Sequence, residues 1–235
     1  MKLRVFLIYI ICAFILASCN GEQKEVIIQQ HAANLQSDAK QQAEPECVYV
    51  SAYAQEDFLE PIEDFSWERE YPAEYVMLHF TSNVVNNREN PYVIDDVRSI
   101  FVSGDVSINY IVDRDGKILC YIPEDRVAWH AGRGSFADNE KYTNQMNKYS
   151  IGIEILAIGS QNDMEQYLLP HEYNALSKDF IGFTDKQYAS LSVLVKDICE
   201  RNSIPFDKTH IIGHDEYNPK KNDPGELFDW DRLFK

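Results

Sequence analysis

The chain has 235 residues, of which 45% are hydrophobic and 12% aromatic, and its formal net charge is −16. This length and composition suit one sizeable globular domain with an additional tail, because two full domains would be cramped. The negative charge repels phosphate polymers and anionic lipid headgroups, so we expect neither nucleic-acid binding nor electrostatic attachment to a membrane. Any membrane attachment must therefore be hydrophobic or covalent.

The N-terminus has the pattern of an export signal. Lys2 and Arg4 form a short basic start, and an apolar run follows over residues 5–17. This run is short for a membrane span and is typical of a signal peptide, although an uncleaved anchor helix is an alternative interpretation. The tetrad Leu-Ala-Ser-Cys at 16–19 resembles the lipobox of bacterial lipoproteins, in which the cysteine is lipidated and becomes the mature N-terminus.

These features divide the chain into three parts. We predict a signal peptide over residues 1–18, a lipidated tether over 19–46, and a globular domain over 47–235. The tether is rich in Gln, Glu, Lys and Ala, a composition typical of a spacer. Lipid on Cys19 implies a domain at the periplasmic face of a bacterial membrane. Asn20 is not the aspartate linked with inner-membrane retention, which favours the outer membrane.

The remaining cysteines indicate no disulfide scaffold. Cys47, Cys120 and Cys199 allow at most one disulfide, and none of them belongs to a C-x-x-C pair. A disulfide framework or a cysteine-rich zinc knuckle is therefore not expected. We predict buried free thiols.

Five mostly apolar segments are predicted to form strands, because each is rich in strand-forming residues. They are 75–81, 108–112, 118–122, 150–156 and 209–214. An Asp-Gly pair within 114–117 predicts a hairpin between the second and third. Gly152 inside the fourth strand allows another part of the chain to approach its backbone closely.

Two helices are expected. The first is short and covers residues 94–101. The second runs from Asp185 to about Arg201, because Thr184 and Gln187 form a capping box and an apolar stripe with helical spacing follows them. A polar loop is expected from Asp215 to Pro224. Strands combined with one long helix favour an α/β fold around a mixed central sheet.

Polar residues whose side chains could bind a metal or transfer protons lie where these predicted strands end. They are His79, Glu154, and His214 followed by Lys221 and Asp223. Two imidazoles and one carboxylate form a ligand set that zinc accepts while keeping a position for water, which then becomes a nucleophile near neutral pH. Spacing alone leaves a second interpretation open, namely that the histidines are hydrogen-bonded core residues.

Seven short motifs follow one another over about residues 73–232. They are Leu-His-Phe-Thr at 78–81, Val-Ser at 106–107 through Arg-Asp-Gly at 114–116, Ala-Trp-His-Ala-Gly at 128–132, Asn147 with Ser-Ile-Gly-Ile-Glu at 150–154, Phe-Thr-Asp-Lys-Gln at 183–187, Gly-His at 213–214, and Lys-Asn-Asp-Pro-Gly at 221–225. Each motif is weak by itself. The ordered set resembles the type 2 N-acetylmuramoyl-L-alanine amidases, which are zinc enzymes related to phage amidases and to the peptidoglycan recognition proteins.

The resemblance implies a mixed central sheet flanked by helices, with Zn²⁺ in a surface groove. It places His79, His214 and Asp223 on the three zinc ligands of the family. Zinc held by two neutral histidines and one carboxylate keeps a net positive charge, so it acidifies water and polarises a carbonyl.

Other residues fall on the family's catalytic and substrate positions. Glu154 falls on the catalytic acid and would accept a proton from water and pass it to the departing amine. Lys221 falls on the catalytic lysine and would stabilise the oxyanion. His130 falls on a substrate-contacting position beside the metal, and Asn147 lies near the path of the sugar or peptide.

Several alternatives stay open for these residues. The loop from His214 to Asp223 is one residue shorter than in the nearest amidase pattern, which leaves open whether Lys220 or Lys221 reaches the site. Glu154 could instead be a structural acid paired with Arg or Lys. His130 and His210 could compete as ligands, and His210 shares strand parity with His214.

The implied reaction is hydrolysis of the amide bond between N-acetylmuramic acid and L-alanine in peptidoglycan or muropeptides, carried out by a monomer. A non-catalytic peptidoglycan-binding module is the alternative, and a zinc amidase for another amide is a third hypothesis. Two long segments, 133–146 and 157–182, either cap the groove and select the substrate or are neutral surface insertions. The sequence leaves open whether an anhydro sugar and a particular stem peptide are required.

Overall fold

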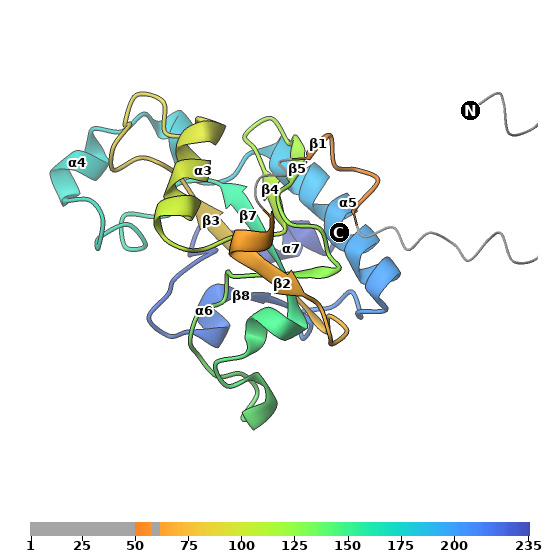
Figure 1. Cartoon of the computed structure of the whole chain (residues 1–235). Coiled ribbons are helices and arrows are strands. Elements are labelled where there is room, and N and C mark those ends of the chain that lie inside the picture. The colour runs from red at the N-terminus through yellow and green to blue at the C-terminus, as the bar shows by residue number, and fades with distance from the viewer. Residues whose placement is uncertain (1–49, 58–61) are drawn as a thin grey trace, which may run out of the picture. The chain divides into compact units, whose positions relative to one another are not determined.

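A computed structural model describes residues 50–57 and 62–235 (Figure 1). The predicted signal peptide, the tether with its lipidation site Cys19, the domain start at residue 47 and the thiol of Cys47 lie outside these residues. No helix of the described ranges combines the length and the apolar character needed to cross a bilayer.

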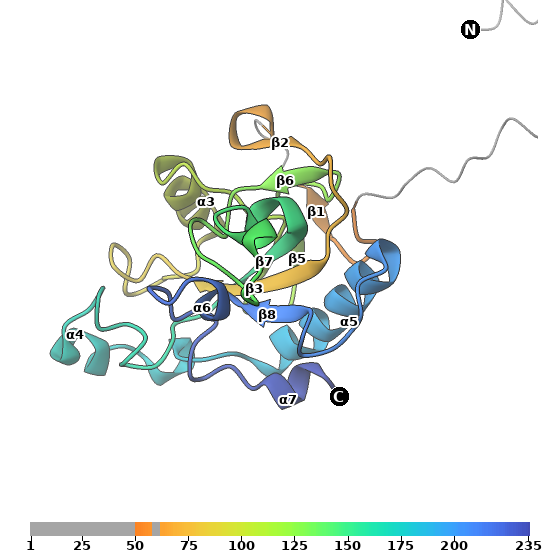
Figure 2. The ribbon, with the colours of Figure 1, turned by 90° about the horizontal axis from the view of Figure 1, so that it is seen from below.

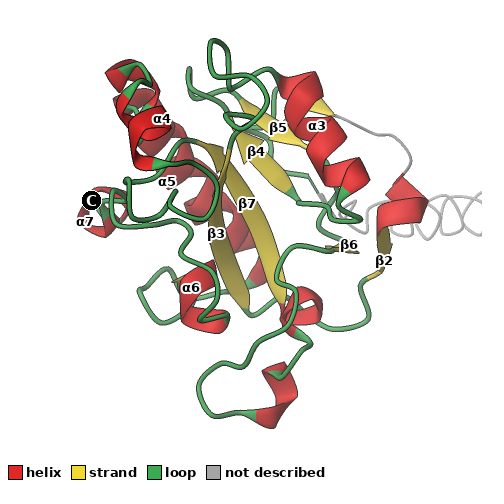
Figure 3. Ribbon diagram, turned by 90° about the vertical axis from the view of Figure 1, so that its left-hand side faces the viewer, coloured by secondary structure: helices red, strands yellow, loops and turns green. Residues whose placement is uncertain are grey.

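A six-stranded mixed sheet forms the centre of the fold (Figures 1 and 3). Neighbouring strands pair in parallel, except for the antiparallel pair β4 and β5. The order across the sheet is β1 (Glu56–Asp57), β5 (Ile118–Cys120), β4 (Tyr110–Val112), β7 (Ser150–Leu156), β3 (Tyr75–Thr81) and β8 (Ile211–Gly213). A separate antiparallel pair joins β2 (Ser66–Glu68) to β6 (Arg126–Ala128).

Helices lie on both faces of this sheet (Figure 2). On one face are α5 (Asp185–Asn202) and α7 (Trp230–Leu233), and on the other is α3 (Ile94–Ser103). The shorter helices are α4 (Pro170–Asn174), α6 (His214–Tyr217), and the 3-10 turns η1 (Ile62–Phe65), η2 (Glu140–Tyr142), η3 (Met146–Tyr149) and η4 (Lys178–Phe180). The expected mixed sheet flanked by helices is confirmed.

Each face of the sheet has its own hydrophobic core, because alternate residues of a strand point to opposite faces. On the α5 face, Leu78 and Ile153 pack in one cluster with Leu191 of the helix. On the α3 face, Ile111 packs with Phe101. The thiols of Cys120 and Cys199 are buried, as expected.

The two longest strands have the bounds that were predicted, whereas the shorter ones differ. Strand β4 begins at Tyr110 rather than at residue 108, because the side chain of Asn109 bonds the backbone of Gly152 and Ile122. Strand β8 ends at Gly213, and His214 begins helix α6, so the prediction of a loop from residue 215 was wrong for its first residues. The strands β1, β2 and β6 were not predicted, because two or three residues show no periodicity.

The start of α5 is tied to the end of β7 that carries the site. Thr184 Oγ1 accepts a hydrogen bond from the Gln187 backbone amide at 3.1 Å, and Gln187 Oε1 accepts one from the Thr184 amide at 2.9 Å. This is the predicted capping box. The buried Gln187 side chain also donates from Nε2 to the carbonyl of Leu156, the last residue of β7, at 2.8 Å.

Loss of this cap should destabilise the domain. Thr184→Ala leaves the Gln187 amide without its acceptor. We therefore expect the free energy of unfolding to fall by about 1 kcal/mol and Tm to fall by about 2–4 °C. Thermal unfolding followed by circular dichroism measures the change. Ser99→Ala, in the exposed middle of α3, is the control and should leave Tm unchanged or slightly higher. Equal Tm values for Thr184→Ala and the wild type would contradict the assignment.

Candidate metal and catalytic site

Three parallel neighbouring strands bring the site together at their carboxyl ends, the edge where ligands commonly bind in α/β sheets. His79 of β3 stands directly opposite Glu154 of β7 in the register. On the other side of β3, Gly213 of β8 pairs with Leu78, so His214 follows beside His79. Paired residues of adjacent strands share a face, and here that face is opposite α5.

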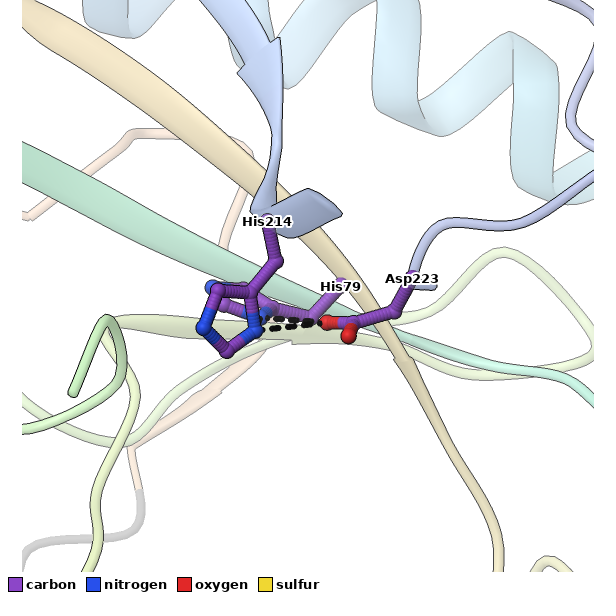
Figure 4. Close-up of side chains that lie close together, drawn as sticks. All are labelled: His79, His214 and Asp223. Carbon is purple, nitrogen blue, oxygen red and sulfur yellow. Dashed lines mark hydrogen bonds and ion pairs between the residues drawn. The ribbon is translucent and has the colours of Figure 1, made fainter. Parts of the chain in front are cut away.

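The two histidines and Asp223 meet at a single point (Figure 4). Asp223 Oδ2 lies 2.8 Å from His79 Nδ1 and 3.0 Å from His214 Nδ1, and the two Nδ1 atoms are 3.1 Å apart. His79 and His214 are buried, with 2% and 4% of their surfaces exposed. These three side chains are the predicted ligand set, and together they are a group that could hold a metal ion.

The loop that carries Asp223 is braced by the segment 157–182. The Asp215 amide donates to the Asp223 carbonyl at 3.1 Å, which closes the loop. The side chain of Asn222 donates to the carbonyl of Asp163 at 2.8 Å, and the Asp163 carboxylate accepts from the Glu226 amide at 3.2 Å. Asp163 is almost completely buried. The segment therefore fixes the residues on both sides of the ligand.

The spacing of the three atoms suits a tetrahedral metal site. Ligands bound at about 2.0–2.1 Å in a tetrahedron lie about 3.3 Å from each other, and the observed separations of 2.8 to 3.1 Å are close to this. Burial and the neighbouring His214 lower the pKa of His79 to about 4. Burial alone would raise the pKa of Asp223, but without a metal the hydrogen bonds that the adjacent imidazoles donate to it outweigh burial and hold that pKa well below its usual range. Neutral imidazole and charged carboxylate are the forms that bind a metal.

Glu154 is a carboxylic acid without a partner at its inner oxygen. Its Oε2 is buried and accepts no hydrogen bond from any described residue. The alternative of a structural ion pair with Arg or Lys is therefore not observed at this oxygen. Burial, reinforced by the charge of Asp223 and opposed by Lys221, raises the pKa of Glu154 well above its ordinary value. An environment that raises the pKa of a carboxyl favours its use as a general base and acid.

A pocket of about 390 Å³ gives access to these groups. Its polar lining includes the three candidate ligands, Glu154 and Lys221, and its apolar lining includes Phe80, Val84, Phe101, Met164 and Tyr167. Lys220 is exposed and is not among the described residues that line the pocket. The structure thus favours Lys221 over Lys220 as the lysine that reaches the site. Met164 and Tyr167 belong to 157–182, so this segment borders the pocket, whereas 133–146 contributes no lining residue.

The two predicted substrate contacts have partners within the protein. His130 lines the pocket, yet its Nδ1 lies 3.0 Å from His79 Nε2 and its Nε2 lies 3.3 Å from Ser150 Oγ. Asn147 does not line the described pocket, and its Oδ1 accepts from the backbone amides of His130 and Ala131 at 3.0 and 2.7 Å. Substrate contact by either residue stays a prediction.

His210 is separate from the site. It follows Asp207, whose carboxylate lies 2.8 Å from its Nδ1, and its ring stacks on Tyr75. The expectation that His210 and His214 share a strand face was wrong, because β8 includes only residues 211–213. The sequence also did not indicate Asp163 or Ala131, since their contacts with the site join segments far apart in the chain.

Comparisons with known proteins agree with this architecture. The family model described as N-acetylmuramoyl-L-alanine amidase matches residues 69–226. The 1,6-anhydro-N-acetylmuramyl-L-alanine amidase AmpD of Salmonella typhimurium is 31% identical over 129 residues, which cover 54% of this chain and 55% of that protein. The chain thus matches about half the length of this curated relative.

Two solved structures are similar as well. A crystal structure of a Se-Met AmpD derivative has a TM-score of 0.56 and 23% identity, and the match covers 80% of this chain and 96% of that chain. This likeness shows a common fold. The second is a complex of the N-acetylmuramyl-L-alanine amidase AmiD from E. coli with the substrate anhydro-N-acetylmuramic acid-L-Ala-D-gamma-Glu-L-Lys. Its TM-score is 0.51 and its identity 27%, over 70% of this chain and 57% of that chain. The family model matches more than half of the residues of this chain, so the chain belongs to the N-acetylmuramoyl-L-alanine amidase family.

Proposed function

We propose that this protein hydrolyses the amide bond between N-acetylmuramic acid and L-alanine in peptidoglycan or muropeptides, with Zn²⁺ as its cofactor. The observation that carries the proposal is the meeting of His79, His214 and Asp223 beside Glu154 in one pocket. The AmiD complex with an anhydro-muramyl peptide supports the class of substrate. The complete donor set disfavours a module that only binds peptidoglycan.

The metal would be held by the Nδ1 atoms of the two histidines and by the carboxylate of Asp223. Two imidazoles and one carboxylate are a ligand set found in catalytic zinc sites, in which a further position is left for water or substrate. When bound, zinc supplies Lewis acidity, which lowers the pKa of water and polarises the scissile carbonyl.

Two side chains of the pocket would then move the proton and stabilise charge. Glu154 takes a proton from the attacking water and delivers it to the amine of the departing L-alanine, which its raised pKa favours. Lys221 places an ammonium group in the same pocket, where it stabilises the negative oxygen that develops on the attacked carbonyl. Burial around the inner oxygen of Glu154 strengthens the interactions of its carboxyl, because water screens charge less there, whereas Lys221 acts from the exposed side of the pocket.

The segment 157–182 would contribute to substrate selection. Tyr167 is about half exposed and Met164 is buried, and both line the pocket. The pocket volume of about 390 Å³ lies within the range of small-ligand sites. A panel of muropeptides, with and without the anhydro sugar and with different stem peptides, tests which of them is preferred.

Replacement of Glu154 tests the proton transfer. We expect the purified wild-type protein with zinc to release free peptide from muropeptides. Glu154→Ala should keep zinc, because the ligands stay, and should lose about 10²–10⁴-fold in turnover, because the base is removed. Peptide release is measured by liquid chromatography with mass spectrometry, and zinc by elemental analysis. A zinc-loaded wild type that never releases peptide would sink the proposed activity.

Glu154→Gln provides a stability control for the same position. The pKa of Glu154 is higher in the folded state than in the unfolded chain. Such a carboxyl makes its full contribution to stability at pH values below its unfolded-state pKa, and this contribution is lost as pH rises through its folded-state pKa. Without metal, the glutamine variant should therefore have a higher Tm than the wild type at about pH 8. The difference should be about 2–4 °C for each kcal/mol by which the free energy of unfolding differs. At about pH 4 the two should melt alike. A variant that melts lower at both pH values would indicate structural damage.

The lysine pair allows a matched test of oxyanion stabilisation. Lys221→Ala should lower kcat by about 10²–10³-fold with little change in KM, as removal of an oxyanion-stabilising group does. Lys220→Ala removes an adjacent exposed charge that does not line the described pocket, and it should stay near the wild-type value. Steady-state kinetics on one muropeptide measures both. Equal losses for the two variants would remove Lys221 from this role.

We further propose that lipid on Cys19 anchors the protein at the periplasmic face of a bacterial membrane, with the outer membrane favoured. Its support is the basic start, the short apolar run and the Leu-Ala-Ser-Cys tetrad. Cys19→Ala should move the protein from the membrane to the soluble fraction and remove the acyl mass seen by mass spectrometry, whereas Cys12→Ala should change neither. A Cys19→Ala protein that is still acylated and membrane-bound would contradict this proposal.

A further inference from the structure

Two consecutive residues, His130 and Ala131, contact the outer nitrogens of the two candidate histidine ligands. His79 Nε2 lies 3.0 Å from His130 Nδ1, and His214 Nε2 lies 3.0 Å from the carbonyl oxygen of Ala131. We propose that His130 and Asn147 are positioning residues, which hold both imidazoles with their Nδ1 lone pairs directed at the metal. This inference rests on the proposed zinc function.

The hydrogen bonds on the His214 side determine one tautomer. The carbonyl of Ala131 can only accept a hydrogen bond. His214 therefore donates from Nε2, and in its neutral form its Nδ1 carries a lone pair. That lone pair faces Asp223 and the Nδ1 of His79.

A longer chain of hydrogen bonds determines the tautomer of His79. The carbonyl of Met146 can only accept, so the hydroxyl of Ser150 donates to it, at 2.7 Å. Ser150 Oγ then accepts from His130 Nε2 at 3.3 Å. In the neutral form of His130, donation from Nε2 leaves a lone pair on Nδ1, which accepts from His79 Nε2 at 3.0 Å. His79 Nδ1 is left with its lone pair toward Asp223.

These two assignments direct three electron-rich atoms at one another. Two imidazole lone pairs and a carboxylate oxygen lie within 3.1 Å, with no proton between them in these tautomers. Such a group is repulsive by itself and becomes favourable around a cation. This orientation of the imidazoles is therefore unfavourable in the protein alone and favourable when a metal ion is bound.

Asn147 holds the segment from which both contacts come. Its single Oδ1 accepts from the amides of His130 and Ala131, the two residues that touch the ligands. The His130 ring also packs on the backbone of Gly152, where an added Cβ would come within 2.7 Å of His130 Cγ. Both ring nitrogens of His130 and the Oδ1 of Asn147 have hydrogen-bond partners inside the protein. These groups therefore position the candidate ligands.

Zinc affinity of the full chain tests this inference, measured by competition with a chelator of known affinity. Partners that orient metal-binding histidines typically contribute 10–100-fold to affinity, so we expect losses of about this size for His130→Ala and Asn147→Ala. His130→Asn, whose Oδ1 replaces Nδ1 as acceptor, and Asn147→Asp, which keeps the acceptor, should recover most of the affinity. The absorption spectrum of the Co²⁺-loaded protein should change in the alanine variants and return in the conservative ones.

Controls separate the outcomes. Asn139→Ala also removes an asparagine that caps a backbone amide, but far from the ligands in η2, and it should bind zinc like the wild type. Should an alanine variant fail to fold by circular dichroism, Ser150→Ala supplies the test and should weaken zinc several-fold, less than the ~10-fold lower limit for a direct partner. Folded variants with wild-type affinity would overturn the positioning role. A wild type that binds no zinc would instead overturn the proposed function.

Discussion

The parallel pairing of β3 with β7 on one side and β8 on the other is the constraint on which the site depends. Seven consecutive residues of β3 pair with β7, and this register sets His79 opposite Glu154. The pairing with β8 brings His214 to the same edge. A slip of one residue would turn every β3 side chain to the other face and place His79 in the α5 core. The two cores on opposite faces make such a slip costly, because each buries one set of alternate residues.

The site itself runs against the preferences of a stable fold. A carboxyl is buried with an inner oxygen that no described residue bonds, and three electron-rich atoms converge within 3.1 Å. Burial of polar groups without partners costs free energy, so the surrounding structure must compensate. It does so through the α5 cap bound to the end of β7 and through buried Asp163, which holds the loop of Asp223. Local conflict inside a consistent frame is the expected mark of a functional site.

Different parts of the fold were predictable to different degrees. Strands β3 and β7 were predicted with their observed bounds, because buried parallel strands are long, continuous apolar runs. Helix α5 was predictable from its cap and apolar stripe. The short strands β1, β2 and β6 leave no period to detect, and their pairing depends on distant segments. The prediction of a strand through His214 failed because the residue begins a helix that continues directly from β8.

By itself the sequence determined which residue types could bind a metal and transfer a proton, and its resemblance to a family selected His79, His214, Asp223 and Glu154 from among other candidates. Without that resemblance, the pattern favoured hydrogen-bonded core histidines over a metal site. The tertiary structure decided that Lys221 rather than Lys220 lines the pocket, that Asp163 braces the loop of Asp223, that His130 contacts His79, and that Asn147 bonds the backbone of His130 and Ala131. Each of these depends on contacts between segments distant in the chain, and spacing along one chain carries no record of how such segments meet.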